Sequence, residues 1–228
     1  MHLSESLVSH IRTLRRRFAA EGLRGVLAFL ASGLRAQVSK HETQLVIVKR
    51  LDQIVVPLRH GQVRIEPIEQ RHMPALRELN RERGDLTGDA RFAADLAAGH
   101  GGFVGFKEQQ LVSCYWWVDG NAPPHRDMHA LGLGIQLGPG DVYGYDLYVH
   151  KRHRAGGTVN DFLFQIETAL RERGYKRLWG YVAGDNRTAR WTYEARGYEP
   201  RWTVERTRTL RRWSNRIVPL EAHERGAA

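Results

Sequence analysis

The run from Val142 to Tyr198 constrains the fold of this chain more than any other part of the sequence. It begins with an apolar, strand-like segment, Val142-Tyr-Gly-Tyr-Asp-Leu-Tyr-Val149. A basic loop with two glycines follows, His150-Lys-Arg-His-Arg-Ala-Gly-Gly157, and then a helical pattern of about five turns from Thr158 towards Arg173. A second strand and a second helix complete the run. This order of elements can build a pocket that holds phosphate.

The physical reason lies at the start of the predicted helix. The first backbone N–H groups of a helix have no carbonyl partner, so they point outward and, together with the helix dipole, attract an anion. Lys151, Arg152 and Arg154 add positive charge at the same place. The loop and helix start are therefore a candidate anion site.

Two motifs in this run resemble those of the GNAT superfamily of acyl-CoA-dependent N-acetyltransferases. The pyrophosphate loop of that family reads Arg/Gln-x-x-Gly-x-Gly/Ala, and this chain has Arg154-Ala-Gly-Gly157-Thr-Val159, which departs at the third fixed position. The last core helix of the family carries Asn-x-x-Ala-x-x-x-Tyr followed by Gly-Phe or Gly-Tyr. The matching residues are Asn186, Ala189, Tyr193, Gly197 and Tyr198. In addition, Asp146-Leu-Tyr-Val149 is similar to the strand that leads into the loop in many amine acetyltransferases of the family.

The resemblance implies both a fold and an activity. The implied fold is α/β (α+β), with a mixed, mostly antiparallel central sheet that splays at two parallel strands and is flanked by helices. The implied activity is transfer of an acyl group, most simply acetyl from acetyl-CoA, to a primary amine by direct attack. Small amines, amino sugars, aminoacyl groups and protein N-termini all remain open as acceptors, because acceptor-recognising loops have no diagnostic composition.

The resemblance also assigns roles to residues. Tyr193 would donate a proton to the departing thiolate; otherwise it is a core tyrosine on a helix face. Asn186 would bind the pantetheine arm of CoA; otherwise it is a plain helix N-cap. The remaining CoA-binding positions are Leu147, Val149, Arg154, Ala155, Gly156, Gly157, Thr158 and Val159.

The general base is the least determined role. Related amine acetyltransferases often have Glu immediately before the strand aspartate, but this chain has Tyr145 there. Asp146 is the nearest carboxylate, although strand alternation sends its side chain to the opposite face from Tyr145. A water-relayed base, Glu66 and Glu69 are equally open.

Charge and composition exclude some classes of protein. The 42% hydrophobic and 26% charged residues are ordinary for a soluble domain, and there is no apolar stretch long enough to span a membrane. The net charge of +10 is concentrated at 150–216, the half that would bind CoA phosphates. No nucleic-acid partner is expected, and a basic nucleic-acid-binding module is a third alternative that only the pI of about 10.2 motivates. The single Cys114 lies in an apolar run, which indicates a buried thiol and a cytoplasmic protein.

Three regions are expected along the chain: an N-terminal extension at 1–60, a GNAT-like domain at 61–212 and a tail at 213–228. Residues 3–38 show apolar spacing typical of two amphipathic helices, and Gln44–Val48 is typical of an extra strand. The helices could dock on the core, pair with a second subunit or lie on an anionic membrane surface. The last option would suit a transferase of longer acyl chains.

Further elements are expected inside the central region. They are a strand at Val63–Ile68, helices at Met73–Arg81 and Ala90–Ala98, a hairpin of Phe103–Phe106 with Leu111–Val118, a strand at His129–Leu137 and a closing strand at Arg201–Leu210. The last residues, Glu221–Ala228, are expected to be disordered. The pairs His125/His129 and His150/His153 have zinc-like spacing but no accompanying ligands, so no metal is expected. A GNAT-like domain that binds CoA or a partner without catalysis is the alternative function, since Val159 and Tyr145 depart from the pattern.

Overall fold

A computed structural model describes residues 39–85, 88–209 and 212–220. The described residues fall into two compact units: one comprises 39–42, 206–209 and 212–215, and the other 43–85, 88–205 and 216–220. The amphipathic helices predicted at 3–38 and the disorder predicted at 221–228 lie outside the described residues. The division of the chain at residues 60 and 212 stays a prediction.

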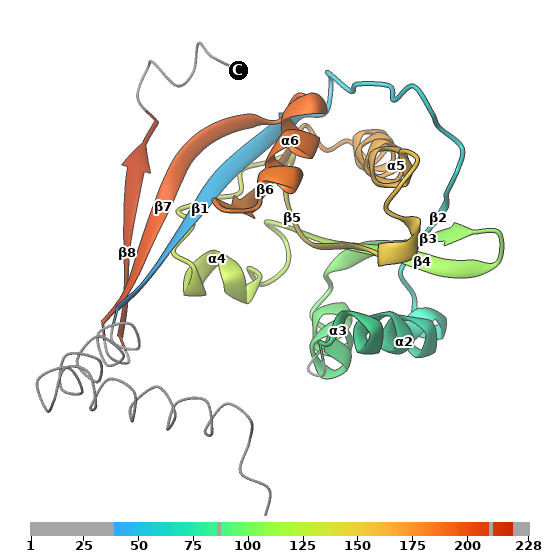
Figure 1. Cartoon of the computed structure of the whole chain (residues 1–228), viewed down its shortest axis with the longest axis horizontal. Helices are drawn as coiled ribbons and strands as arrows, with labels where there is room; N and C mark the ends of the chain where they lie inside the picture. Colours follow the sequence, from blue (N-terminus) through green and yellow to red (C-terminus); the bar gives the residue numbers. More distant parts are fainter. Residues whose placement is uncertain (1–38, 86–87, 210–211, 221–228) are drawn as a thin grey trace, which may run out of the picture. The chain divides into compact units, whose positions relative to one another are not determined.

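An eight-stranded sheet runs through the structure in the order β2-β3-β4-β5-β6-β1-β7-β8 (Figure 1). Its strands are β1 (Ser39–Arg50), β2 (Arg64–Pro67), β3 (Gly101–Lys107), β4 (Gln110–Asp119), β5 (Asp141–Val149), β6 (Arg177–Ala183), β7 (Glu199–Thr209) and β8 (Arg212–Pro219). β5 and β6 pair in parallel, whereas β2–β3, β3–β4, β4–β5 and β1–β6 are antiparallel. The mixed, mostly antiparallel sheet predicted from the sequence is confirmed.

Helices cover both faces of the sheet (Figure 1). They are α2 (Met73–Arg83), α3 (Gly88–Ala97), α4 (Arg126–Ala130), α5 (Thr158–Glu172) and α6 (Arg187–Ala195), with short 3-10 turns at Gln70–His72 and Lys151–His153. Alternate residues of β4 show why two layers form: Cys114 and Trp116 pack with α2 and α3, while Tyr115 packs with α5. The period of two along a strand thus gives the sheet an apolar core on each face.

The predicted strand near Gln44–Val48 is confirmed and is longer than expected. As β1 it lies between β6 and β7, and residues Gln44–Arg50 pair with β6. Val46, Ile47 and Val48 are buried, as the β-branched composition of the segment favours. An N-terminal strand therefore supplies an interior strand of the sheet.

One prediction about secondary structure is wrong. The segment predicted as a strand at His129–Leu137 is instead the end of α4 followed by an irregular stretch. The Nδ1 atom of His125 accepts a hydrogen bond from the N–H of Asp127 at 3.3 Å and so caps the helix, and Gly132 and Gly134 have positive φ angles of 62° and 69°. The region predicted as a tail contains the strand β8, which lies beside β7 at the edge of the sheet.

A β-bulge interrupts β5 at the candidate site. Tyr145 pairs with Trp116 and Tyr148 pairs with Cys114, so three steps along β5 match two along β4. Asp146 has a φ angle of 54°, which is unusual for a residue with a side chain. The extra residue shifts the alternation, and both Tyr145 and Asp146 point towards the layer of α2 and α3. The predicted opposite orientation of these two side chains is therefore wrong.

A buried ion pair joins the two helices on the other face. Nε of Arg196, which follows α6, donates to Oε1 of Glu167 on α5 at 2.9 Å, and the two side chains are 2% and 0% exposed. The guanidinium also donates to the carbonyl of Asn160 at 3.1 Å, and Nζ of Lys49 donates to the carbonyl of Arg196 at 2.7 Å. These bonds fix α6 against α5 and β1.

Replacing Arg196 with Met should destabilise the fold strongly, because Glu167 would keep a buried charge without a partner. We expect the free energy of unfolding to fall by about 3–5 kcal/mol, measured by urea unfolding at neutral pH. Arg201→Ala is the control, since its pair with Glu199 is exposed and should contribute less than about 1 kcal/mol. Equal urea midpoints for the two variants would contradict a structural role for the buried pair.

Candidate functional site

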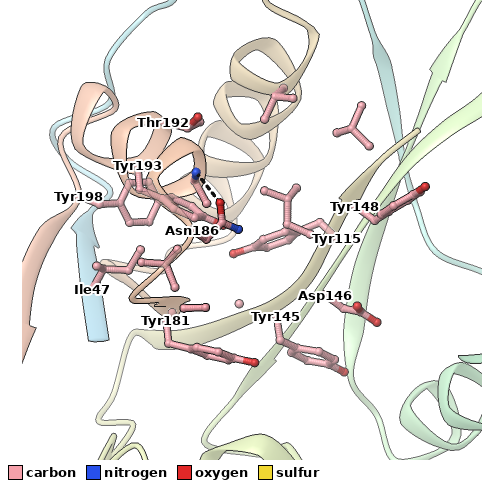
Figure 2. A pocket seen from close by; sticks show the side chains of 18 of the residues that line it. Ile47, Tyr115, Tyr145, Asp146, Tyr148, Tyr181, Asn186, Thr192, Tyr193 and Tyr198 are labelled. Atoms are coloured by element: carbon pink, nitrogen blue, oxygen red, sulfur yellow. Dashed lines mark hydrogen bonds between the residues drawn. The ribbon is translucent and has the colours of Figure 1, made fainter. Parts of the chain in front are cut away.

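A cleft of about 830 Å³ opens where β5 and β6 separate. The parallel pairing covers only Asp141–Tyr143 on β5 and Arg177–Trp179 on β6. Beyond these residues both strands continue, and Gly144–Val149 and Trp179–Ala183 line the two sides of the cleft (Figure 2). The splay predicted between two parallel strands is the space in which a ligand can lie.

Glycine at position 144 keeps this space open. A Cβ atom at Gly144 would lie 1.6 Å from the hydroxyl oxygen of Tyr115, whose ring comes from the neighbouring strand β4. The main chain of β5 can therefore approach the Tyr115 side chain this closely only because residue 144 is a glycine. Tyr115 is 3% exposed, and burial raises the pKa of its phenol well above its ordinary value.

The start of α5 borders the same cleft. Gly157 is the N-cap residue, with a φ angle of 92° and no side chain to accept a hydrogen bond. The first backbone bond is donated by Asp161 to the carbonyl of Gly157 at 2.9 Å. The N–H groups of the three residues between them have no backbone partner among the described residues, which is the arrangement that binds an anion.

Asp161 anchors this helix start to the chain before β2. Its carboxylate, which is fully buried, accepts hydrogen bonds from the N–H groups of Gly61, Gln62 and Val63 at 3.0, 2.8 and 2.9 Å. The negative charge of Asp161 is therefore balanced by main-chain donors of the protein and by the positive end of the helix dipole. The N–H groups that face the cleft stay available.

The basic loop is held by its own contacts. Nε of Arg154 donates to the carbonyl of Val149 at 2.8 Å, and its guanidinium lies 5.4 Å from the centre of the Tyr148 ring. The hydroxyl of Thr158 donates to the carbonyl of Ala155 at 3.2 Å. These bonds close the loop over the end of β5 and keep the charge of Arg154 at the cleft.

Tyr193 enters the cleft from α6 (Figure 2). Its ring packs edge-on against Tyr198, with ring centres 4.8 Å apart. Burial, with smaller contributions from Glu167 and Tyr181, raises the pKa of Tyr193. The phenol therefore stays protonated at neutral pH and can donate a hydrogen bond into the cleft.

Asn186 caps α6. Its Oδ1 accepts a hydrogen bond from the N–H of Ala189 at 3.1 Å, drawn as the dashed line in Figure 2. The side chain is exposed and lines the cleft, so its amide nitrogen can still donate to a ligand. Capping and ligand binding are compatible at this residue.

Asp146 lies at the cleft but is engaged in ion pairs. Its Oδ1 is 2.7 Å from Nη2 of Arg83, and its Oδ2 is 2.5 Å from Nη2 of Arg91. Asp85 bridges the same two guanidinium groups at 3.2 and 2.9 Å. Both carboxylate oxygens are therefore occupied by guanidinium groups, and this geometry does not favour Asp146 as a general base.

Most of the residues predicted for the site are brought together around this cleft. Tyr193, Asp146, Leu147, Val149, Arg154, Gly157, Val159 and Asn186 line it, whereas Ala155, Gly156 and Thr158 do not and support the loop. Sequence reasoning missed the aromatic side chains that form much of the wall, which are Tyr115, Tyr145, Trp179, Tyr181 and Tyr198. Tyr143 and Tyr145 alternate in the sequence, which was the available signal for a tyrosine-lined strand.

Among the residues that the structure describes, no group of three or more His, Cys, Asp or Glu side chains is arranged to hold a metal ion. No helix within the described ranges is long and apolar enough to cross a membrane.

Comparisons with known proteins find likeness in structure and none in sequence. No protein-family model matches the chain, and no curated protein matches it. The structural matches are at low sequence identity, so they bear on the fold alone.

Three solved structures illustrate the likeness. A GCN5-related N-acetyltransferase from Sphaerobacter thermophilus has a TM-score of 0.54 and 12% identity, with 88% of this chain and 58% of that chain covered. The GCN5-related glucosamine N-acetyltransferase region of a fungal multi-domain β-N-acetylglucosaminidase has a TM-score of 0.57 and 11% identity, with 81% and 23% covered. A protein of unknown function from Staphylococcus epidermidis has a TM-score of 0.58 and 9% identity, with 79% and 66% covered.

The chain spans less than two thirds of the length of the solved chains just described. This protein has the GNAT fold.

Proposed function

We propose that the chain is an acyl-CoA-dependent N-acyltransferase that moves an acetyl group from acetyl-CoA to a primary amine by direct attack. One observation carries the proposal: a single cleft brings the open start of α5 together with the partly buried phenol of Tyr193. The first can hold a diphosphate, and the second can serve a leaving thiolate. The two motifs of the sequence thus meet in space.

The donor side of the cleft fits CoA by its chemistry. The N–H groups after Gly157 and the basic loop would bind the pyrophosphate, as helix starts do for phosphate groups. Val159 lies partly buried against the core, so its departure from the usual small residue leaves the helix start accessible. Asn186 would bind the amides of the pantetheine arm, which is neutral and needs hydrogen bonds more than charge.

Acyl transfer needs a polarised carbonyl, a proton for the thiolate and a neutral amine. The edge of β5 beyond Tyr143 has no strand pairing on the side of β6, so N–H groups near Leu147 and Val149 would polarise the thioester carbonyl. Tyr193 would give its proton to the sulfur and regain the proton that the attacking nitrogen releases as the amide forms. The amine is the nucleophile, so no covalent enzyme intermediate is required.

The amine acceptor would enter the cleft from the side that α3 and α4 border. Arg91, His125 and Asp127 from these elements line the cleft together with the aromatic rings of Trp179 and Tyr181. Aromatic faces and a carboxylate attract an ammonium group. A cationic amine is therefore the acceptor class that this wall favours.

Substitution of Gly157 should weaken CoA binding specifically. Wild-type protein at an acetyl-CoA concentration of about a hundred times its dissociation constant should gain about 2.7 kcal/mol of folding stability. Gly157→Ala forces a side chain onto a φ angle of 92° where the anion binds, and we expect at least about a tenfold rise in the dissociation constant by calorimetry. Gly174→Ala is a matched control, with a φ angle of 87° and open space around it at the other end of α5. If both variants bind acetyl-CoA equally well, the helix start is not the anion site.

Replacing Tyr193 with Phe should lower kcat about a hundredfold, since the thiolate loses its proton donor, with little change in the dissociation constant of acetyl-CoA. Release of free CoA thiol reports the rate. Tyr175→Phe is the control, because its hydroxyl donates to Asp119 at 2.8 Å outside the cleft. An unchanged kcat in Tyr193→Phe would remove the proton-donor role. Tight CoA binding by a wild-type protein that transfers acetyl to no amine would instead favour a binding domain without catalysis.

A further inference from the structure

Tyr145 lines the cleft and is joined to a buried histidine. Its hydroxyl oxygen lies 2.7 Å from Nδ1 of His100, which follows α3. Nε2 of His100 lies 2.8 Å from the carbonyl oxygen of Pro123. Tyr145 and His100 are each 5% exposed, so the pair forms a fixed polar chain inside an aromatic wall.

The partners of His100 determine its tautomer. The carbonyl of Pro123 can only accept, so Nε2 carries a proton and donates it. In the neutral imidazole Nδ1 is then an acceptor, and the hydroxyl of Tyr145 must donate to it. The phenol thus points its proton away from the cleft and leaves its oxygen lone pairs free to accept.

A carboxylate also lies beside the pair. One carboxylate oxygen of Asp95 is 4.0 Å from Nδ1 of His100. Burial, followed by the charge of Asp95, raises the pKa of Tyr145, so no phenolate accumulates. A proton that arrives at the tyrosine oxygen would therefore have to displace the existing one onto His100.

Other charged or titratable groups also face the pair. They are Arg91 of α3, Asp146 of β5 and His125 before α4, and Asp127 and Arg126 in turn act on His125. Arg91 and Asp146 are engaged with each other. The ring of His125 stacks on that of Tyr145 with ring centres 3.8 Å apart, and burial lowers the pKa of His125.

We propose that Tyr145 and His100 form a proton relay that deprotonates the acceptor amine, with Tyr145 contacting the amine and His100 acting through it. The relay rests on the proposed N-acyltransferase function. It would supply the base for which Asp146, held by Arg83 and Arg91, is poorly suited.

The proton transfer balances without a further reactant. The oxygen of Tyr145 accepts a proton from the amine nitrogen as its own O–H bond breaks, and that proton forms an N–H bond at Nδ1 of His100. The imidazolium then donates to the oxygen of Tyr145 and to the carbonyl of Pro123. After transfer of the acetyl group, the proton returns to solvent by the reverse path.

Two substitutions test the relay. His100→Asn keeps an oxygen near the position of Nδ1 to accept from Tyr145 but cannot take up a proton, and Tyr145→Phe removes the hydroxyl and keeps the ring. The wild-type protein is first assayed for CoA release from acetyl-CoA with glucosamine, glycinamide, spermidine and a tetrapeptide with a free N-terminus. The best acceptor is then used from about pH 6 to about pH 10, the upper limit being near the pKa of an alkyl ammonium group.

We expect kcat to fall about a hundredfold near neutral pH in both variants, while the dissociation constant of acetyl-CoA changes by less than about twofold. The deficit should shrink as pH rises, because the amine then loses its proton to solvent. Tyr143→Phe is the matched control, since its ring stacks 6.0 Å from Tyr145 on the same strand and its buried hydroxyl has no partner among the described residues.

The outcomes separate the relay from the proposed function. If His100→Asn and Tyr145→Phe keep the wild-type rate and pH profile, the relay is overturned and the transferase stands. If His100→Asn does not fold, Tyr145→Phe decides, because its ring packing is unchanged. If the wild-type protein releases CoA with none of the four acceptors, the proposed transfer and the relay are overturned together.

Discussion

The short parallel pairing of β5 with β6 is the constraint on which the rest of the site depends. Three residues on each strand are paired, and the strands then separate. Continued pairing would close the cleft and leave no unpaired main chain for a thioester. The bulge at Asp146 contributes to the separation, since bulges bend a strand and increase its twist. The backbone therefore sets the place of the cleft, and side chains add to its walls.

A splayed sheet lacks the hydrogen bonds that would hold its two halves together, so other contacts must fix the walls. Glu167 and Arg196 do this for α5 and α6, and Asp161 fixes the start of α5. Each uses a buried charge with several hydrogen bonds, which is costly to desolvate but defines one geometry. These charges sit beside the cleft and not at its centre, where they would compete with a ligand.

The sequence predicts the donor side of the site better than the acceptor side. Gly157, Asn186 and Tyr193 sit in short motifs whose geometry comes from a helix start or a single helix face, so local sequence is sufficient. The bulge at Asp146 could not be predicted, because it depends on the register between β4 and β5. The assignment of a strand to residues 129–137 failed for a similar reason: the cap formed by His125 is a side-chain bond that periodicity does not show.

The pair of Tyr145 and His100 has the same origin. The two residues are 45 positions apart, and they meet only because β5 lies beside β4 while α3 ends beneath the sheet. A buried phenol must find an acceptor, and in an aromatic wall few are available. Tyr143 and Tyr198 are buried nearby with hydroxyl groups that have no partner among the described residues. Tyr145 differs from these two tyrosines because it faces the cleft and its hydroxyl also has a partner that can accept a proton. The proposed proton transfer requires both features.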